Sequence, residues 1–227
     1  MDALEVKLRA GLNALDLSLN DAQVRDLLAY RVLIEKWNKV YNLTAVRDPA
    51  EMLTHHLLDS LAVIAPLRRQ LEQMPQAEDK ALRLLDVGSG AGLPGVVIAI
   101  CCPEIRVDCV DTVGKKAAFI QQVAVALKVG NLRGLHARVE NLTDTYQVIS
   151  SRAFASLIDF TNWSTQALAP QGVWMAMKGK HPADELAVLP QGVSVFHVEQ
   201  LAVPGLGAER CVVWLRLHEA MDCRGQA

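Results

Sequence analysis

The sequence predicts an α/β protein, with a mainly parallel sheet of seven strands and an N-terminal helical extension. Apolar residues recur at helical spacing over the first 75 residues. After residue 80, short apolar runs alternate with helical stretches, which is typical of βαβ units and parallel strands. Four glycines within eight residues follow the first of these runs. We therefore divide the chain into an extension, 1–75, and a main domain, 76–227.

The extension carries clear signals for the start and end of a long helix. Asn20 and Gln23 have the spacing of a capping box at a helix start. Apolar residues then follow at helical spacing, namely Val24, Leu27, Leu28, Ile34 and Trp37. We expect a turn near Asn42.

A second helix is predicted in the rest of the extension. Asp48 and Pro49, followed by Glu51, are typical of a helix start. We expect Pro66 to end this helix. The polar segment 73–80 contains one proline and is interpreted as the connection to the main domain.

The main domain is predicted to alternate strands and helices. The expected strands are 82–87, 106–111, 132–136, 147–151, 172–178, 193–200 and 211–217. The expected helices are 94–101, 115–128, about 156–168 and 182–188. Only loop separates the last two strands, which favours a closing antiparallel hairpin. Ligands of such sheets bind at the carboxyl ends of the strands, so we look for functional residues there.

The glycine-rich loop after the first strand admits two ligands. Gly90, Gly92 and Gly95 match the G-x-G-x-x-G fingerprint of dinucleotide sites, and Asp111 follows about 20 residues later. Asp86 argues against a dinucleotide, because its carboxylate would lie close to the pyrophosphate. S-adenosylmethionine has a sulfonium and an ammonium group and no phosphate. Asp86 therefore favours S-adenosylmethionine, with Asp111 accepting hydrogen bonds from the ribose or capping the next helix.

Composition and sequence argue against several other classes of protein. The net charge of −2 is not typical of a sequence-blind nucleic-acid binder, so any RNA contact must use a local patch. The five cysteines form no CxxC pair, and we predict small buried thiols and no metal site. The sequence shows no signal peptide and no apolar run long enough to cross a bilayer. We expect a cytoplasmic protein without a membrane partner, and a monomer.

Three separated stretches resemble one bacterial family. Leu84–Gly92, LLDVGSGAG, looks like motif I of class I S-adenosylmethionine-dependent methyltransferases, which have a Rossmann-like fold. It resembles the RsmG family, formerly called glucose-inhibited division protein B, together with two further stretches. One is ISSRAFASL at 149–157, and the other is WNKVYNLT at 37–44, which continues through RDP at 47–49 to HLLDS at 56–60. The similarity runs from about residue 25 to about residue 217. The segment between Glu140 and Arg152 looks shorter than in some relatives.

The resemblance implies a reaction and a set of residues. The family transfers a methyl group from S-adenosylmethionine to N7 of guanine 527 in 16S ribosomal RNA, which leaves S-adenosylhomocysteine. Its cofactor contacts match Gly88, Leu93, Val139, Glu140 and Arg152, and its basic residue after the fifth strand matches Lys178. To these we add Asp86, Gly90 and Asp111 as cofactor-binding residues from the loop argument above.

Arg152 and Lys178 are the candidate catalytic residues. Arg152 is expected to clamp the methionine carboxylate or an RNA phosphate, or to form a salt bridge with Asp86 or Glu140. Lys178 lies at a strand end, where a lysine is commonly only solvated.

The residues after the fourth strand are consistent with N7 chemistry. The Asn/Asp-Pro-Pro-aromatic loop of enzymes that methylate exocyclic amines is missing there. No cysteine ends the fourth or fifth predicted strand, as C5 methylation of a pyrimidine requires. Guanine N7 has a free lone pair, so catalysis can rest on proximity and orientation without a general base. Phe154 is a candidate for stacking on the product base, or a core aromatic.

Two other functions stay open from the sequence. One is a nicotinamide-dependent oxidoreductase, and the other is a non-catalytic RNA-binding or assembly factor. For the methyltransferase hypothesis, the near-neutral charge predicts weak binding to naked RNA. An assembled or partly assembled small ribosomal subunit is then the expected substrate.

Overall fold

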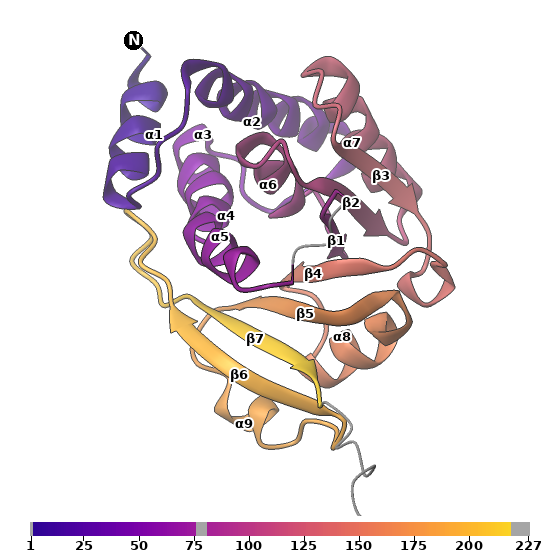
Figure 1. Ribbon diagram of the computed structural model, residues 1–227. Helices are drawn as coiled ribbons and strands as arrows, with labels where there is room; N and C mark the ends of the chain where they lie inside the picture. The colour runs from indigo at the N-terminus through magenta and orange to yellow at the C-terminus, as the bar shows by residue number, and fades with distance from the viewer. Residues whose placement is uncertain (1, 76–80, 219–227) are drawn as a thin grey trace, which may run out of the picture.

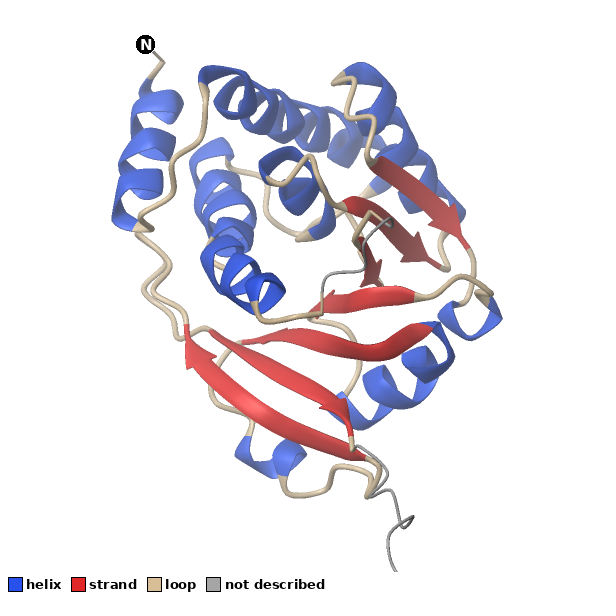
Figure 2. Cartoon of the chain, viewed as in Figure 1, coloured by secondary structure: helices blue, strands red, loops and turns tan. Residues whose placement is uncertain are grey.

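A single sheet of seven strands organises the computed structural model, which describes residues 2–75 and 81–218 (Figures 1 and 2). The strand order is β3-β2-β1-β4-β5-β7-β6. The first five strands in that order pair in parallel, and β7 pairs antiparallel with both β5 and β6. The strands are β1 (Arg83–Val87), β2 (Arg106–Asp111), β3 (Leu132–His136), β4 (Tyr146–Arg152), β5 (Leu168–Lys178), β6 (Val193–Gln200) and β7 (Cys211–Leu217). The order reverses between β1 and β4, where a ligand site is expected.

The predicted strands and the closing hairpin are confirmed, but the start of one strand was predicted too late. The β5 strand begins at Leu168, four residues before the predicted 172. Pro170, Gln171 and Gly172 look like a turn, and Gln171 has a left-handed φ of 60°. The pairing of β4 with β5 shifts register there, between Tyr146 and Val148, so the strand passes through the irregularity.

Helices cover both faces of the sheet. The helices of the extension are α1 (Ala3–Ala14), α2 (Asp21–Tyr41), α3 (Pro49–Met52), the π-helix η1 (Leu53–Leu58), α4 (Asp59–Leu61) and α5 (Ile64–Glu72). Those of the main domain are α6 (Gly95–Cys101), α7 (Gly114–Ala126), the 3₁₀ turn η2 (Val139–Asn141), α8 (Leu157–Ser164), the 3₁₀ turn η3 (Thr165–Ala167) and α9 (Ala183–Leu186). The predicted helix 156–168 is therefore shorter, and its last residue already belongs to β5.

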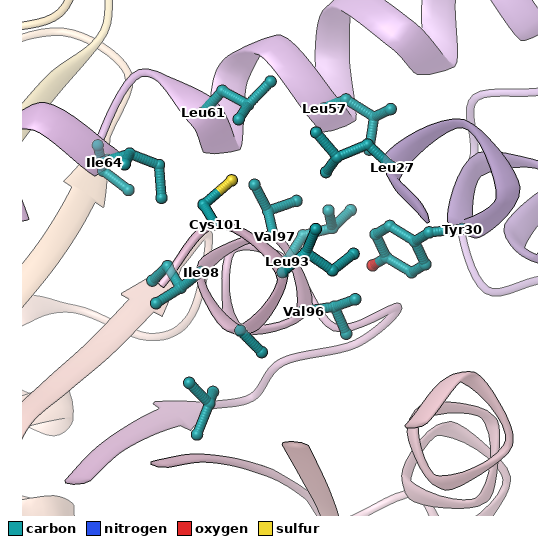
Figure 3. Close-up of a cluster of buried hydrophobic side chains, with 14 of the residues drawn as sticks. Leu27, Tyr30, Leu57, Leu61, Ile64, Leu93, Val96, Val97, Ile98 and Cys101 are labelled. Carbon is teal, nitrogen blue, oxygen red and sulfur yellow. The ribbon is translucent and has the colours of Figure 1, made fainter. Parts of the chain in front are cut away.

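Strand alternation divides the core between the two faces. Leu84 and Met175 face a cluster with α6, α7 and the extension, whereas Leu85 and Trp174 face a cluster with α8. The α6 helix is buried along its whole length. Figure 3 shows side chains of α2, η1, α4 and α5 directed at it. One cluster thus continues from the extension to the sheet across the predicted boundary at residue 75, which itself stays a prediction.

The predicted start and end of the long helix are confirmed. The Gln23 backbone N–H donates to Asn20 Oδ1 at 2.9 Å, and the Asn20 N–H donates to Gln23 Oε1 at 3.1 Å. This reciprocal pair is a capping box. Asn42 ends α2 with a φ of 49°, in the left-handed conformation common at helix ends.

The predicted helix start at Asp48 is confirmed, but the prediction for Pro66 is wrong. Asp48 accepts from the N–H groups of Ala50 and Glu51. Pro66 lies in the first turn of α5, where a missing N–H costs no helix hydrogen bond. The interruption comes earlier, at a turn over residues 62–63. Of the predicted connection 73–80, residues 76–80 lie outside the described residues.

Four of the cysteines are buried thiols, as predicted: Cys101, Cys102, Cys109 and Cys211. Cys223 lies outside the described residues. Over residues 2–75 and 81–218, no helix is long and apolar enough to cross a membrane. The same residues contain no group of three His, Cys, Asp or Glu side chains that could hold a metal ion.

Candidate active site

The loop between β1 and α6 presents bare backbone at the carboxyl edge of the sheet. Gly88 and Gly90 have φ values of +64° and +58°, a conformation in which an L side chain is strained. A Cβ added at Gly90 would meet nothing nearer than 4.0 Å, so the loop is open there. Tyr30 of α2 donates its hydroxyl hydrogen to the Ala91 carbonyl, so the extension supports the loop from behind.

Asp86 lies beneath this loop. Its Oδ2 accepts from the Gly95 backbone N–H at 3.0 Å, and its Oδ1 accepts from the Ser150 hydroxyl at 2.9 Å. Burial raises the pKa of Asp86 to about 6. The carboxylate therefore ties the first turn of α6 to β1 and β4. It also engages an N–H group at the start of α6, where a dinucleotide would place its pyrophosphate.

Asp111 lies at the end of β2 and faces the loop. Its Oδ2 accepts from the Gly90 N–H at 3.0 Å and its Oδ1 from the Val113 N–H at 2.8 Å. Lys116 Nζ approaches Oδ2 to 3.6 Å. Asp111 thus closes the turn before α7, which begins at Gly114, and each oxygen keeps capacity for a further hydrogen bond.

Two cavities open along this edge. The first, which we call the β2 cavity, has a volume of about 460 Å³ and lies beside the end of β2. The second, the β5 cavity, has a volume of about 450 Å³ and lies between the ends of β4 and β5 and the extension. Gly88 and Ala153 line both.

The structure brings eight of the nine predicted site residues to these cavities. The β2 cavity is lined by Gly88, Asp111, Val139 and Glu140. The β5 cavity is lined by Gly88, Gly90, Leu93, Arg152 and Lys178. Asp86, the ninth, lines neither.

Arg152 has a partner that the sequence did not indicate. Its Nη1 donates to Asp59 Oδ2 at 2.7 Å and to the His55 carbonyl at 3.0 Å. Arg210 Nε donates to the other oxygen of Asp59 at 2.8 Å. Asp59 is only 2% exposed, so two guanidinium groups share one buried carboxylate. Asp59 and Arg210 were missed because 93 and 151 residues separate the partners.

Lys178 forms a separate ion pair with an acidic side chain. Its Nζ donates to both oxygens of Glu185 on α9, at 2.9 and 2.8 Å. The backbone N–H of Leu157 donates to the same carboxylate at 2.7 Å. Lys178 therefore adds little net charge to the β5 cavity, whereas the Asp59 cluster leaves one positive charge.

The family model described as rRNA small subunit methyltransferase G matches residues 23–213. The matched range covers most of the extension and of the main domain, and it includes the residues that line both cavities. The chain belongs to this family. A ribosomal RNA small subunit methyltransferase G of Albidiferax ferrireducens is 69% identical over 220 residues, which are 95% of this chain and 98% of that protein. The protein of the same name from Polaromonas naphthalenivorans is 66% identical over 213 residues, 94% of this chain and 96% of that one.

Solved methyltransferases share the fold of this family member. TrmN of Thermus thermophilus aligns with a TM-score of 0.54 and 20% identity over 73% of this chain and 53% of that one. A SAM-dependent methyltransferase of Aquifex aeolicus gives 0.50 and 15% identity over 74% and 97%. The predicted fold class is confirmed.

Residues of the extension complete the β5 cavity in this family member. Thr44 Oγ1 lies 2.8 Å from His56 Nε2, and the Thr44 N–H donates to Asn38 Oδ1 at 2.9 Å. Burial lowers the pKa of His56 to about 4, so its ring is neutral at pH 7. These bonds hold the loop after α2 against the cavity. Thr44 and His56 were not among the predicted site residues.

Proposed function

We propose that this chain transfers a methyl group from S-adenosylmethionine to N7 of guanine 527 in 16S ribosomal RNA. Membership of the rRNA small subunit methyltransferase G family carries the proposal. The N7 atom and position 527 rest on the family resemblance of the three sequence stretches. The cavities support the proposal because they join the expected cofactor residues at one edge of the sheet.

The residues present fit S-adenosylmethionine as cofactor. In the β2 cavity, Asp111 would accept hydrogen bonds from the ribose, beside Val139 and Glu140. In the β5 cavity, Gly90 and Leu93 would border the methionine part, within reach of the positive Asp59 cluster. The bound cofactor supplies an electrophilic methyl group on a sulfonium that leaves readily. The Asp86–Gly95 bond argues against a dinucleotide and hence against the oxidoreductase alternative.

The protein's part in the reaction is to bind and orient. Guanine N7 is unprotonated at neutral pH, so no side chain needs to remove a proton from it. The surplus charge of Arg152 and Arg210 over Asp59 would attract an RNA phosphate or the methionine carboxylate. Neutral His56 holds its loop without adding a charge that would repel the cationic product base.

The partner we propose is the small ribosomal subunit, assembled or partly assembled, in the cytoplasm. A net charge of −2 gives little long-range attraction for naked RNA. The rest of the recognition would then come from the shape of the subunit. The protein would act as a monomer.

Transfer of labelled methyl groups tests this proposal. Purified protein, labelled S-adenosylmethionine and small subunits that lack the modification should yield labelled N7-methylguanosine after digestion to nucleosides. Large subunits are the control and should stay unlabelled, and protein-free 16S RNA should react more slowly. Label in another nucleoside would contradict the N7 assignment. Subunit binding without any transfer would favour a non-catalytic assembly factor.

A further inference from the structure

The proposed cofactor residues are divided between two cavities that meet at one point. Asp111, Val139 and Glu140 line only the β2 cavity, and Gly90 and Arg152 line only the β5 cavity. The two linings share Gly88 and Ala153. One molecule that contacts both sets must therefore pass over Gly88 and Ala153.

An aromatic ring covers this crossing. A Cβ added to Gly88 would run into three ring atoms of Phe154, so the ring lies directly against Gly88. Phe154 lines the β2 cavity and not the β5 cavity. The ring therefore lies on the β2-cavity side of Gly88, one of the two residues at which the cavities meet.

The ring of Phe154 is partly buried, and it packs against the core cluster on the α8 side of the sheet. It makes T-shaped contacts with Trp163 and Phe160, with ring centroids 5.8 and 6.4 Å apart and interplanar angles of 78° and 77°. Trp163 is itself 41% exposed, so the outer side of this aromatic group faces solvent.

The backbone next to Phe154 is strained. Ala153 has a φ of 51°, a left-handed conformation that costs a non-glycine residue roughly 1 kcal/mol or more. On either side the chain is anchored, by Arg152 on Asp59 and by Ser156, whose hydroxyl caps α8. A change of conformation at Ala153 would relieve this strain and move the adjoining Phe154 while both anchors stay in place.

We propose that Phe154 competes with the cofactor: its ring occupies the place over Gly88 that S-adenosylmethionine must take, and leaves that place on binding. The inference rests on the proposed function, which puts the cofactor across both cavities. Affinity is then reduced by the fraction of molecules in which the ring covers Gly88. Removal of the ring should tighten binding, whereas removal of an ordinary wall of a site weakens it.

Equilibrium binding and a liganded structure together test this competition. Titration calorimetry with S-adenosylhomocysteine, without RNA, should give a Kd for Phe154→Ala that is lower than wild type by about threefold or more. A crystal structure of the wild-type complex should show the ring away from Gly88. Phe196→Ala is the matched control, since that ring packs on Arg216 away from both cavities, and its Kd should equal wild type. Thermal unfolding without ligand shows that each variant folds.

Either of two results would overturn the proposal. One is equal or weaker binding by folded Phe154→Ala, and the other is a ring that still covers Gly88 in the complex. Wild-type protein that does not bind S-adenosylhomocysteine at all would overturn this inference and the proposed function together. Binding without methyl transfer to small subunits would contradict the proposed function alone.

Discussion

The cluster of Arg152, Asp59 and Arg210 concentrates the charge of the site on three side chains from distant parts of the chain. Asp59 comes from the extension, Arg152 from the end of β4 and Arg210 from the residue before β7. Removal of either arginine would leave Asp59 paired with the other and would remove the surplus positive charge, whereas removal of Asp59 would leave two neighbouring cations without their shared carboxylate. These residues should therefore be sensitive even to small changes.

Replacement of Arg152 by alanine should reduce methyl transfer about 100-fold or more. It removes the surplus positive charge that the proposal pairs with the methionine carboxylate or an RNA phosphate, and truncating one partner of a desolvated charge pair costs about 3 kcal/mol. Initial rates with small subunits measure the effect. Arg69→Ala is the control, because that arginine forms an exposed pair with Glu199 and should keep wild-type activity. A folded Arg152→Ala protein with more than half of the activity would show that the cluster is not part of the site.

Two buried titrating groups should make opposite contributions to stability in acid. Asp86 has a folded pKa of about 6, above its ordinary value of 3.8, so its contribution to stability falls as pH rises from about 4 to 6. His56 has a folded pKa of about 4, below its ordinary 6.5, so its contribution falls as pH drops from about 6.5 to 4. Each shift corresponds to roughly 3 kcal/mol, and the two nearly cancel in the wild type.

Removal of either group should reveal the pH dependence of stability that the other contributes. Between pH 4 and pH 6.5, the free energy of unfolding of Asp86→Asn should rise by roughly 3 kcal/mol more than that of wild type, and that of His56→Gln by roughly 3 kcal/mol less. Urea unfolding across this pH range measures both slopes. Slopes equal to wild type in both variants would mean that neither pKa is shifted by burial.

At the scale of elements, apolar runs and turn residues predicted most of the fold, and the errors share a cause. Pro66 and the start of β5 were misplaced because local signals for a break were overridden by neighbours. The glycine loop and Asp111 were predictable because motif spacing is local. The pairing of Arg152 with Asp59 was not predictable, because it depends on how the extension packs on α6.

The junction of β1 and α6 should tolerate no side chain at Gly95. An added Cβ would come within 2.9 Å of both Cβ and Oδ2 of Asp86, which holds the Gly95 N–H. Gly95→Ala should therefore lose about 2 kcal/mol of stability, as overpacked cores do, and bind S-adenosylhomocysteine more weakly. Gly130→Ala is the matched control, because no atom lies within 4 Å of its added Cβ. Urea unfolding and calorimetry measure both effects, and equal stability of the two variants would contradict this packing.

At the scale of the whole molecule, the extension and the sheet share one core. The α6 helix is buried between them, and residues of α2, η1 and α5 pack on it (Figure 3). Burial of large apolar side chains is worth about 2 kcal/mol each, so the main domain loses much of its stability without this cover.

The full chain should therefore unfold in a single transition, and residues 76–227 alone should fail to form a stable fold. Calorimetry with circular dichroism tests the first point, through coincident transitions. Expression of 76–227 tests the second, with loss of a cooperative melt as the expected result. Two separate transitions, or a stable fragment, would show that the extension is an independent domain.

Location of the methylated base in the RNA tests the proposed function most directly. Small subunits that lack the modification are incubated with the protein and S-adenosylmethionine. Their 16S RNA is then cleaved by chemistry selective for N7-methylguanine, and the break is mapped by primer extension. We expect a single break at guanine 527, absent from reactions with Arg152→Ala. A break at another guanine, or a methylated product that resists this cleavage, would contradict the assignment.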